Sequence, residues 1–182
     1  MTLATIGGTP TERYAGLAQD IFQATLIQPP LDPRGRKDGF NVIYRLREFG
    51  FPFIYSSLFT NSRSLKARPE LVQKAVAALA ESIYFVEKNP ERAMNSIGKA
   101  LRINDVDTLR SAYDTYAKHL INRRMLVPPK MVSDTLELDR ADGVIIRRRS
   151  SEIFDNNFAE HLEKSGFMKE LWGSAMSDGG QS

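Results

Sequence analysis

The pattern of apolar residues changes near residue 50, and this change limits the folds open to the chain. Before it, short apolar runs alternate with turn residues; after it, apolar residues recur at helical spacing over long stretches. We expect strands at 2–6, 21–28 and 40–46, with a helix from Pro10 to about Gln19 between the first two. This order requires parallel pairing through a right-handed crossover. The predicted class is therefore α/β with a parallel sheet, helix-rich in its carboxy-terminal part.

The second part of the chain reads as a series of helices. An aromatic-rich extended segment at 51–60 leads into the strongest helical pattern, predicted at 70–87 behind Pro69. Its apolar stripe is expected to be buried and comprises Leu71, Ala75, Leu79, Ile83 and Val86. Further helices are expected from Pro90 to about Leu101, after a cap at Asn104, from Pro128-Pro129 towards Leu138, and from about Ser151 to Trp172. Residues 174–182 are small and polar, which is typical of a disordered tail.

The chain lacks the residues of most catalytic and metal sites. It has no cysteine, which excludes disulfides, thiol nucleophiles and cysteine-ligated metals. Its two histidines, His119 and His161, do not stand at metal-ligand spacing. Nucleophile-elbow, phosphate-loop and dinucleotide-binding sequences do not occur. We therefore expect no catalytic residue, no metal and no cofactor.

Charge and hydropathy restrict the partners. The net charge of +3 favours anionic ligands but is too small to indicate nucleic acid, and the densest basic cluster, Arg147-Arg148-Arg149, has no interleaved aromatic residues. Apolar runs such as 75–80 are too short to cross a bilayer. The first residues lack the basic start and apolar core of a signal peptide. The chain is thus expected either to act in the cytoplasm or to begin inside a longer protein.

One local motif suggests a ligand site. Ile6-Gly7-Gly8-Thr9-Pro10 leads from an expected strand through glycines into a helix, with Thr9 as N-cap and Glu12 completing a capping box. Backbone N–H groups at a helix start can bind an anion, and glycine allows close approach. The same motif also joins strand to helix in ordinary α/β units. A purely structural role is therefore the alternative.

Five segments form a recognisable series: Gly7-Gly8-Thr9-Pro10-Thr11-Glu12-Arg13, Ala24-Thr25-Leu26-Ile27-Gln28-Pro29-Pro30, Lys37-Asp38-Gly39-Phe40, Arg68-Pro69-Glu70-Leu71-Val72 and Glu87-Lys88-Asn89-Pro90-Glu91-Arg92-Ala93. In this order and spacing they resemble solute-binding proteins of ABC importers of the nitrate/sulfonate/taurine type. The likeness covers most of residues 3–173. One step departs from the family: its Gly-x-x-Asp-Ala is Asp20-Ile21-Phe22-Gln23-Ala24 here.

The resemblance implies a partial type 2 periplasmic-binding-protein fold, with two parallel-sheet lobes around a cleft. Residues 1–50 would be the remainder of the second lobe and 51–173 the returning half of the first. The family's opening strands have no counterpart before Met1, so the chain corresponds to the carboxy-terminal half. Too few strands would then cover the sheet, and we expect either a missing amino-terminal half or a homodimer.

The resemblance also implies a function. The chain would bind a small, anionic or polar solute in the periplasm without catalysis and, in the full-length family, dock on an ABC permease. The expected ligand-binding residues are Gly8, Thr9, Gln28, Tyr55 and Ser56. Two alternatives stay open: a ligand-sensing domain or remnant without a transport role, and an enzyme similar to thiamine-pyrimidine synthases, which the absence of cysteine disfavours.

Overall fold

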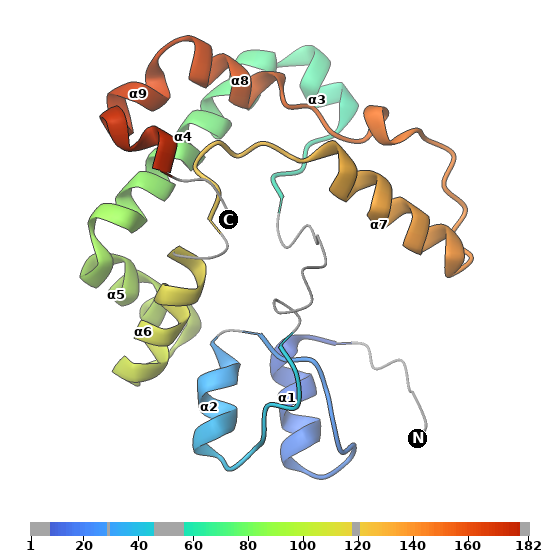
Figure 1. Cartoon of the computed structure of the whole chain (residues 1–182), viewed down its shortest axis with the longest axis vertical. Helices are drawn as coiled ribbons and strands as arrows, with labels where there is room; N and C mark the ends of the chain where they lie inside the picture. Colours follow the sequence, from blue (N-terminus) through green and yellow to red (C-terminus); the bar gives the residue numbers. More distant parts are fainter. Residues whose placement is uncertain (1–7, 29, 46–56, 118–120, 179–182) are drawn as a thin grey trace. The chain divides into compact units, whose positions relative to one another are not determined.

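The computed structural model describes residues 8–28, 30–45, 57–117 and 121–178, and these residues form helices joined by irregular segments (Figure 1). The helices are α1 (Pro10–Ala18), α2 (Leu31–Lys37), α3 (Ser62–Ala67), α4 (Pro69–Lys88), α5 (Pro90–Leu101), α6 (Val106–Thr115), α7 (Pro129–Ala141), α8 (Asn157–Lys164) and α9 (Phe167–Trp172). Short 3-10 helices are η3 (Ser150–Glu152) and η4 (Gly173–Asp178). The expected helix-rich character of the carboxy-terminal part is confirmed.

The chain divides into two compact units. Unit 1 comprises Met1–Arg45 and Pro90–His119, and unit 2 comprises Leu46–Asn89 and Leu120–Ser182. The sequence placed one boundary near residue 50 and assigned all of 51–173 to a single lobe. In the structure α5 and α6 group instead with the first part of the chain, because α6 packs on α2.

Unit 1 is built from α1, α2, α5 and α6. Tyr14 of α1 is buried, meets the Phe40 ring edge-on at 5.9 Å between centroids, and donates its hydroxyl hydrogen bond to Asp38. Gly98 allows α5 to pack closely on α6, since a Cβ there would lie 3.0 Å from Cδ1 of Leu109 on α6 and 2.9 Å from the carbonyl oxygen of Ile103 in the turn between them. Ala93, Met94, Leu109 and Ala112 are buried between these two helices.

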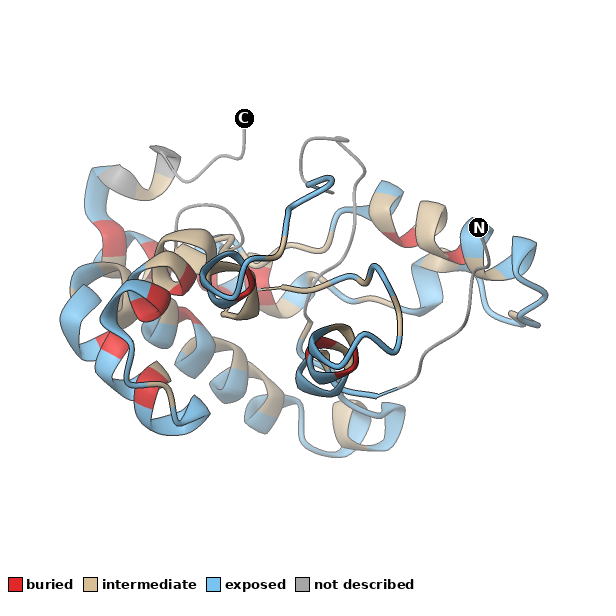
Figure 2. Cartoon of the chain, turned by 90° about the horizontal axis from the view of Figure 1, so that it is seen from below, coloured by how far each residue is buried: buried red, intermediate tan, exposed pale blue. Residues whose placement is uncertain are grey.

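Unit 2 has its core where α4 meets α8 and α9. The buried members are Ala80, Leu162, Met168 and Trp172. Figure 2 shows the buried residues of the chain on its helices, with the joining segments exposed or half-buried. At the edge of this core the Trp172 ring packs edge-on against the Tyr84 ring of α4, with 5.6 Å between the ring centroids.

The expected strands are not found in the described residues. Residues 21–28 and 40–45 are irregular, while 2–6 and Leu46 lie outside the described part. A strand requires hydrogen bonds to a neighbouring strand. Here the segment 21–28 is instead held to α1, because the Ile21 N–H donates to the carbonyl of Gly16 at 2.9 Å and Arg13 donates to the carbonyl of Leu26.

The proline residues of the sequence predict where several helices begin, whereas the capping residue of α6 was predicted wrongly. The helices expected from Pro10, Pro69, Pro90 and Pro129 are present. The cap of α6 is Asp105 rather than Asn104, since the Asp105 carboxylate accepts from the Thr108 N–H at 2.9 Å. The helices expected from about Ser151 to Trp172 are present as η3, α8 and α9.

Two helices lie in segments for which no helix was expected, and the start of the expected tail is also helical. The segment after Pro30 contains α2, and α3 follows Asn61, whose side chain accepts from the Ser64 N–H at 2.8 Å. The tail expected from Ser174 is helical to Asp178, because Met176 packs against the core of unit 2.

The apolar face of α4 also differs from the expectation. Leu71 is 53% exposed and Leu79 is 39% exposed, and Ala75 is exposed as well, whereas Ala80 is fully buried. Ile83 and Val86 are half-buried. Burial of Leu71, Ala75 and Leu79 was therefore the wrong expectation: α8 and α9 cover the neighbouring face of the helix.

Candidate functional site

The turn before α1 has the geometry that its sequence predicts. Gly8 has a φ of +99°, and a Cβ at this position would lie 2.7 Å from Oε2 of Glu12. The Thr9 hydroxyl accepts from the Glu12 N–H at 3.3 Å, and the Glu12 carboxylate accepts from the Thr9 N–H at 2.5 Å. The capping box is thus confirmed. Glycine is required here by its backbone angle and by the position of Glu12.

Glu12 changes what this helix start can bind. The hydrogen bond from the Thr9 backbone, followed by that with its side chain, lowers the pKa of Glu12 below the usual value of a glutamate. A carboxylate of the chain itself therefore occupies the backbone N–H of Thr9. Among the described residues, the N–H of Thr11 has no hydrogen-bond partner. An external anion would have to use this group or displace Glu12.

Arg13 connects the turn to the segment 21–28, and the sequence analysis did not select it as a site residue. Its Nη1 donates to the carbonyl oxygen of Gly8 at 2.9 Å, and its Nε donates to that of Leu26 at 3.4 Å. The half-buried guanidinium lies beside the capping box and brings a positive charge to it. Its place inside the Gly-Gly-Thr-Pro-x-x-Arg motif was the signal that could have identified it.

The other expected site residues are not assembled around this turn. Gln28 is half-buried, and its carbonyl oxygen accepts from the Leu31 N–H at 2.9 Å, at the start of α2. No hydrogen bond joins Gln28 to Gly8 or Thr9 within the ranges described. Tyr55 and Ser56 lie outside the described residues. Gly8, Thr9 and Arg13, with the carbonyl of Leu26, form the candidate site.

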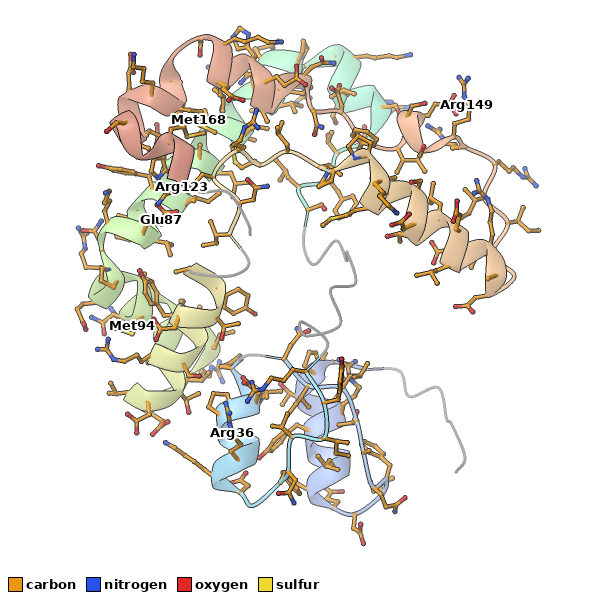
Figure 3. The ribbon with its side chains drawn as sticks, viewed as in Figure 1. Arg36, Glu87, Met94, Arg123, Arg149 and Met168 are labelled. Atoms are coloured by element: carbon orange, nitrogen blue, oxygen red, sulfur yellow. The ribbon has the colours of Figure 1, made fainter. Side chains whose placement is uncertain are left out.

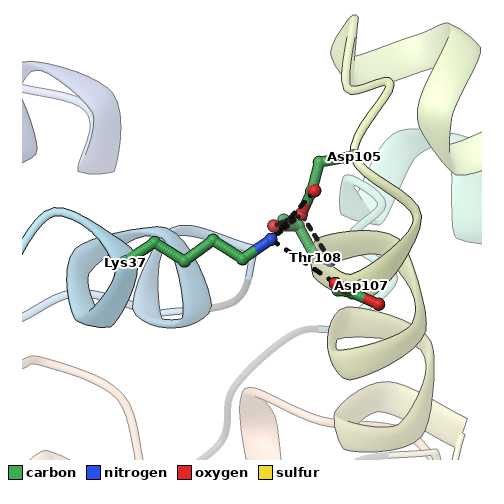
Figure 4. Close-up of polar contacts among 4 residues, drawn as sticks. All are labelled: Lys37, Asp105, Asp107 and Thr108. Atoms are coloured by element: carbon green, nitrogen blue, oxygen red, sulfur yellow. Dashed lines mark hydrogen bonds and ion pairs between the residues drawn. The ribbon is translucent and has the colours of Figure 1, made fainter.

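A second polar cluster in unit 1 joins α2 to α6, and the sequence analysis did not predict it. The Lys37 ammonium donates to both carboxylate oxygens of Asp105, at 2.8 and 2.9 Å, and lies 3.7 Å from the Asp107 carboxylate (Figure 4). The hydrogen bond from Lys37, aided by those from Thr108, lowers the pKa of Asp105 to about 2. The same contact raises the pKa of Lys37.

Unit 2 contains a half-buried ion pair whose role is structural. Arg123 Nε donates to both carboxylate oxygens of Glu87, at 2.9 and 3.0 Å, and Trp172 Nε1 donates to Oε2 at 2.9 Å. Figure 3 shows Glu87 on α4 directed towards Arg123. These bonds tie α4 to α9 and to the segment before α7.

No group of three or more His, Cys, Asp or Glu side chains that could hold a metal occurs in the part of the chain that the structure describes. Of the two histidines, His161 is exposed on α8, and His119 lies outside that part. Among the helices described, none is long and apolar enough to span a bilayer.

The chain was compared with protein-family models, with curated proteins and with solved structures, and none of the three comparisons finds a match. The contacts of the candidate site therefore carry the functional argument.

Proposed function

We propose that the chain belongs to the substrate-binding component of an ABC-type importer and contributes to capturing a small anionic or polar solute. One observation carries the proposal: the turn at Gly8, with its positive φ, leads directly into the capped start of α1, and Arg13 stands beside it. Backbone donors, a helix dipole and a guanidinium at one place favour a sulfonate, nitrate or similar group. The motif order described above supports the family.

The proposal assigns a role to each residue of the turn. Gly8 would allow the solute to approach the backbone, Thr9 would supply its hydroxyl, and Thr11 would supply its backbone N–H. Arg13 would provide the charge that selects an anion. Gln28, Tyr55 and Ser56 remain proposed contacts, and a parallel-sheet lobe with a permease as docking partner remains part of the proposal.

Thermal unfolding with a panel of taurine, ethanesulfonate, nitrate and sulfate tests this function. Binding to the folded state raises the melting temperature once the ligand exceeds its dissociation constant. We expect a rise with at least one of these solutes, and its loss in Arg13→Gln. Thr9→Val should reduce the rise and also lower stability by about 1 kcal/mol, because the cap hydroxyl is removed. Thr11→Val is the matched control, since Thr11 makes no capping hydrogen bond through its side chain.

A role without transport is the second candidate, and the position of Glu12 favours it. A carboxylate that already accepts from the Thr9 N–H competes with any external anion for this group. Glu12→Gln removes that negative charge, so it should strengthen anion binding if the turn is a receptor site. If neither the native chain nor this variant responds to any of the solutes, the importer function is wrong and the ligand-free alternative replaces it.

A further inference from the structure

A hollow of about 320 Å³ lies in unit 1 between α2 and the turn that joins α5 to α6. This volume is near the lower end, about 300 Å³, of the range of pockets that hold small molecules. Its lining combines two kinds of side chain. Apolar surface comes from Pro30, Leu31 and Ile103, and charge comes from Arg34, Lys37, Asp38, Arg102 and Asp105.

Both carboxylates that line the hollow already have partners. Asp105 receives two hydrogen bonds from Lys37, and Asp38 lies 3.5 Å from Nε of Arg34 and accepts from the Tyr14 hydroxyl. Arg102 differs from these residues, because its guanidinium has no hydrogen bond or ion pair with any residue that the structure describes. The hollow therefore contains one cation whose charge is not balanced within its lining.

The backbone holds Arg102 and Ile103 in place. Arg102 follows the end of α5 with a φ of +56°, a left-handed angle that glycine usually adopts at this position. The next N–H, that of Ile103, donates to the carbonyl of Gly98 at 2.9 Å, which closes the end of the helix. The exposed Arg102 and the half-buried Ile103 are thus neighbours on a turn whose backbone is fixed.

We propose that this hollow binds a small organic anion whose charged group pairs with Arg102 and whose apolar body packs on Leu31 and Ile103. A purely inorganic anion would leave the apolar lining unused, and an uncharged ligand would leave Arg102 unpaired. The proposal does not depend on the importer function, which concerns Gly8, Thr9 and Arg13. Because few atoms can be buried in a hollow of this size, the dissociation constant should be on the order of millimolar.

Nuclear magnetic resonance titration of the full chain with hexanoate tests the proposal. Hexanoate should cause saturable shifts of the backbone amides of Leu31, Ile103 and Asn104. Acetate has the same charge without the apolar body, and hexanol has the body without the charge. Each should produce a shift only at concentrations several-fold higher. Arg102→Gln should weaken hexanoate binding about fivefold, as expected for one charge-assisted contact at a partly exposed site.

Lys99→Gln is the control, because it removes an exposed cation from α5, in the same unit, at a residue that does not line the hollow. It should leave hexanoate binding unchanged, and the amide spectrum of each variant shows whether it is folded. The proposal is overturned if both variants weaken binding equally, or if hexanol binds as well as hexanoate. Shifts confined to Thr9–Arg13 would also overturn it while supporting the turn before α1 as the anion site.

Discussion

Tyr14 is the residue whose ionisation depends most on the fold of unit 1. Burial, followed by the hydrogen bond to the Asp38 carboxylate, raises the pKa of Tyr14 from 10.0 to about 12. The folded state therefore favours the neutral phenol. The stability from this group is present below pH 10.0 and is lost as the pH rises through about 12.

We expect one tyrosine to ionise later than the others in an absorbance titration, and Tyr14→Phe to remove this late step. The substitution keeps the ring that packs on Phe40 and removes only the hydroxyl, so it should cost about 1 kcal/mol of unfolding free energy. If every tyrosine of the folded protein titrates together near the ordinary value, the contact with Asp38 does not exist in solution.

Asp105 should make the stability of unit 1 sensitive to acid. Its pKa is lowered from 3.8 to about 2, chiefly by Lys37, so its contribution is present above pH 3.8 and lost as the pH falls through about 2. Asp105→Asn keeps a side chain that can cap α6 but removes the charge that binds Lys37. The melting temperature of this variant should lie below that of the native chain at neutral pH, and the difference should shrink below pH 3.8. Equal melting temperatures of the two proteins at neutral pH would show that Asp105 acts only as a cap, because Asn retains that role.

For individual residues, the sequence predicts contacts between positions that are close together in the chain. The capping box of Thr9 and Glu12 depends on residues three positions apart, and it is confirmed. The contact of Lys37 with Asp105 joins residues 68 positions apart, and only the packing of α2 on α6 brings them together. Arg13 makes contacts of both the local and the distant kind. Its motif is local, but its hydrogen bond to the carbonyl of Leu26 requires the chain to turn back after α1.

The helix α4 was predicted correctly from the sequence, but the face of it that is buried was predicted wrongly. Ala80 is fully buried against Leu162, Met168 and Trp172, while Leu79 is 39% exposed. Ala80→Asp should therefore lower the unfolding free energy by roughly 3 kcal/mol, because it places a charge in the core. Leu79→Asp should cost less than about 1 kcal/mol.

Chemical denaturation of the two variants measures this difference. The neighbouring positions share one helix and receive the same new side chain, so helix propensity and net charge are matched. An equal loss of stability in both would mean that Leu79 also lies in a core.

The reason for this error is physical. Apolar residues occur on two faces of α4, so the helical period identifies the helix without deciding which face is covered. That choice depends on Trp172 and Met168, which approach from the far end of the chain. The described residues of the strands expected at 21–28 and 40–46 are irregular for a related reason, since a strand's hydrogen bonds come from a neighbour that its own sequence does not specify.

For the whole molecule, the same two segments leave apolar surface uncovered. The exposed apolar residues in them are Ile21, Leu26, Val42, Ile43 and Tyr44. Apolar side chains on a segment with strand-like sequence favour pairing between chains. We therefore expect the isolated chain to associate with itself, with a mass from light scattering that rises with concentration.

Two isoleucines allow a test of whether association depends on the segment 40–45 or on exposed apolar surface in general. Ile43 is 82% exposed among the apolar neighbours in unit 1, and Ile145 is 83% exposed in unit 2, shortly before three arginines whose charge opposes association. Ile43→Thr should lower the measured mass at high concentration, and Ile145→Thr should not, although each removes the same apolar group from an equally exposed position. Equal effects of the two would show that association follows total apolar surface, and a constant monomer mass in the native chain would show that these segments need no partner.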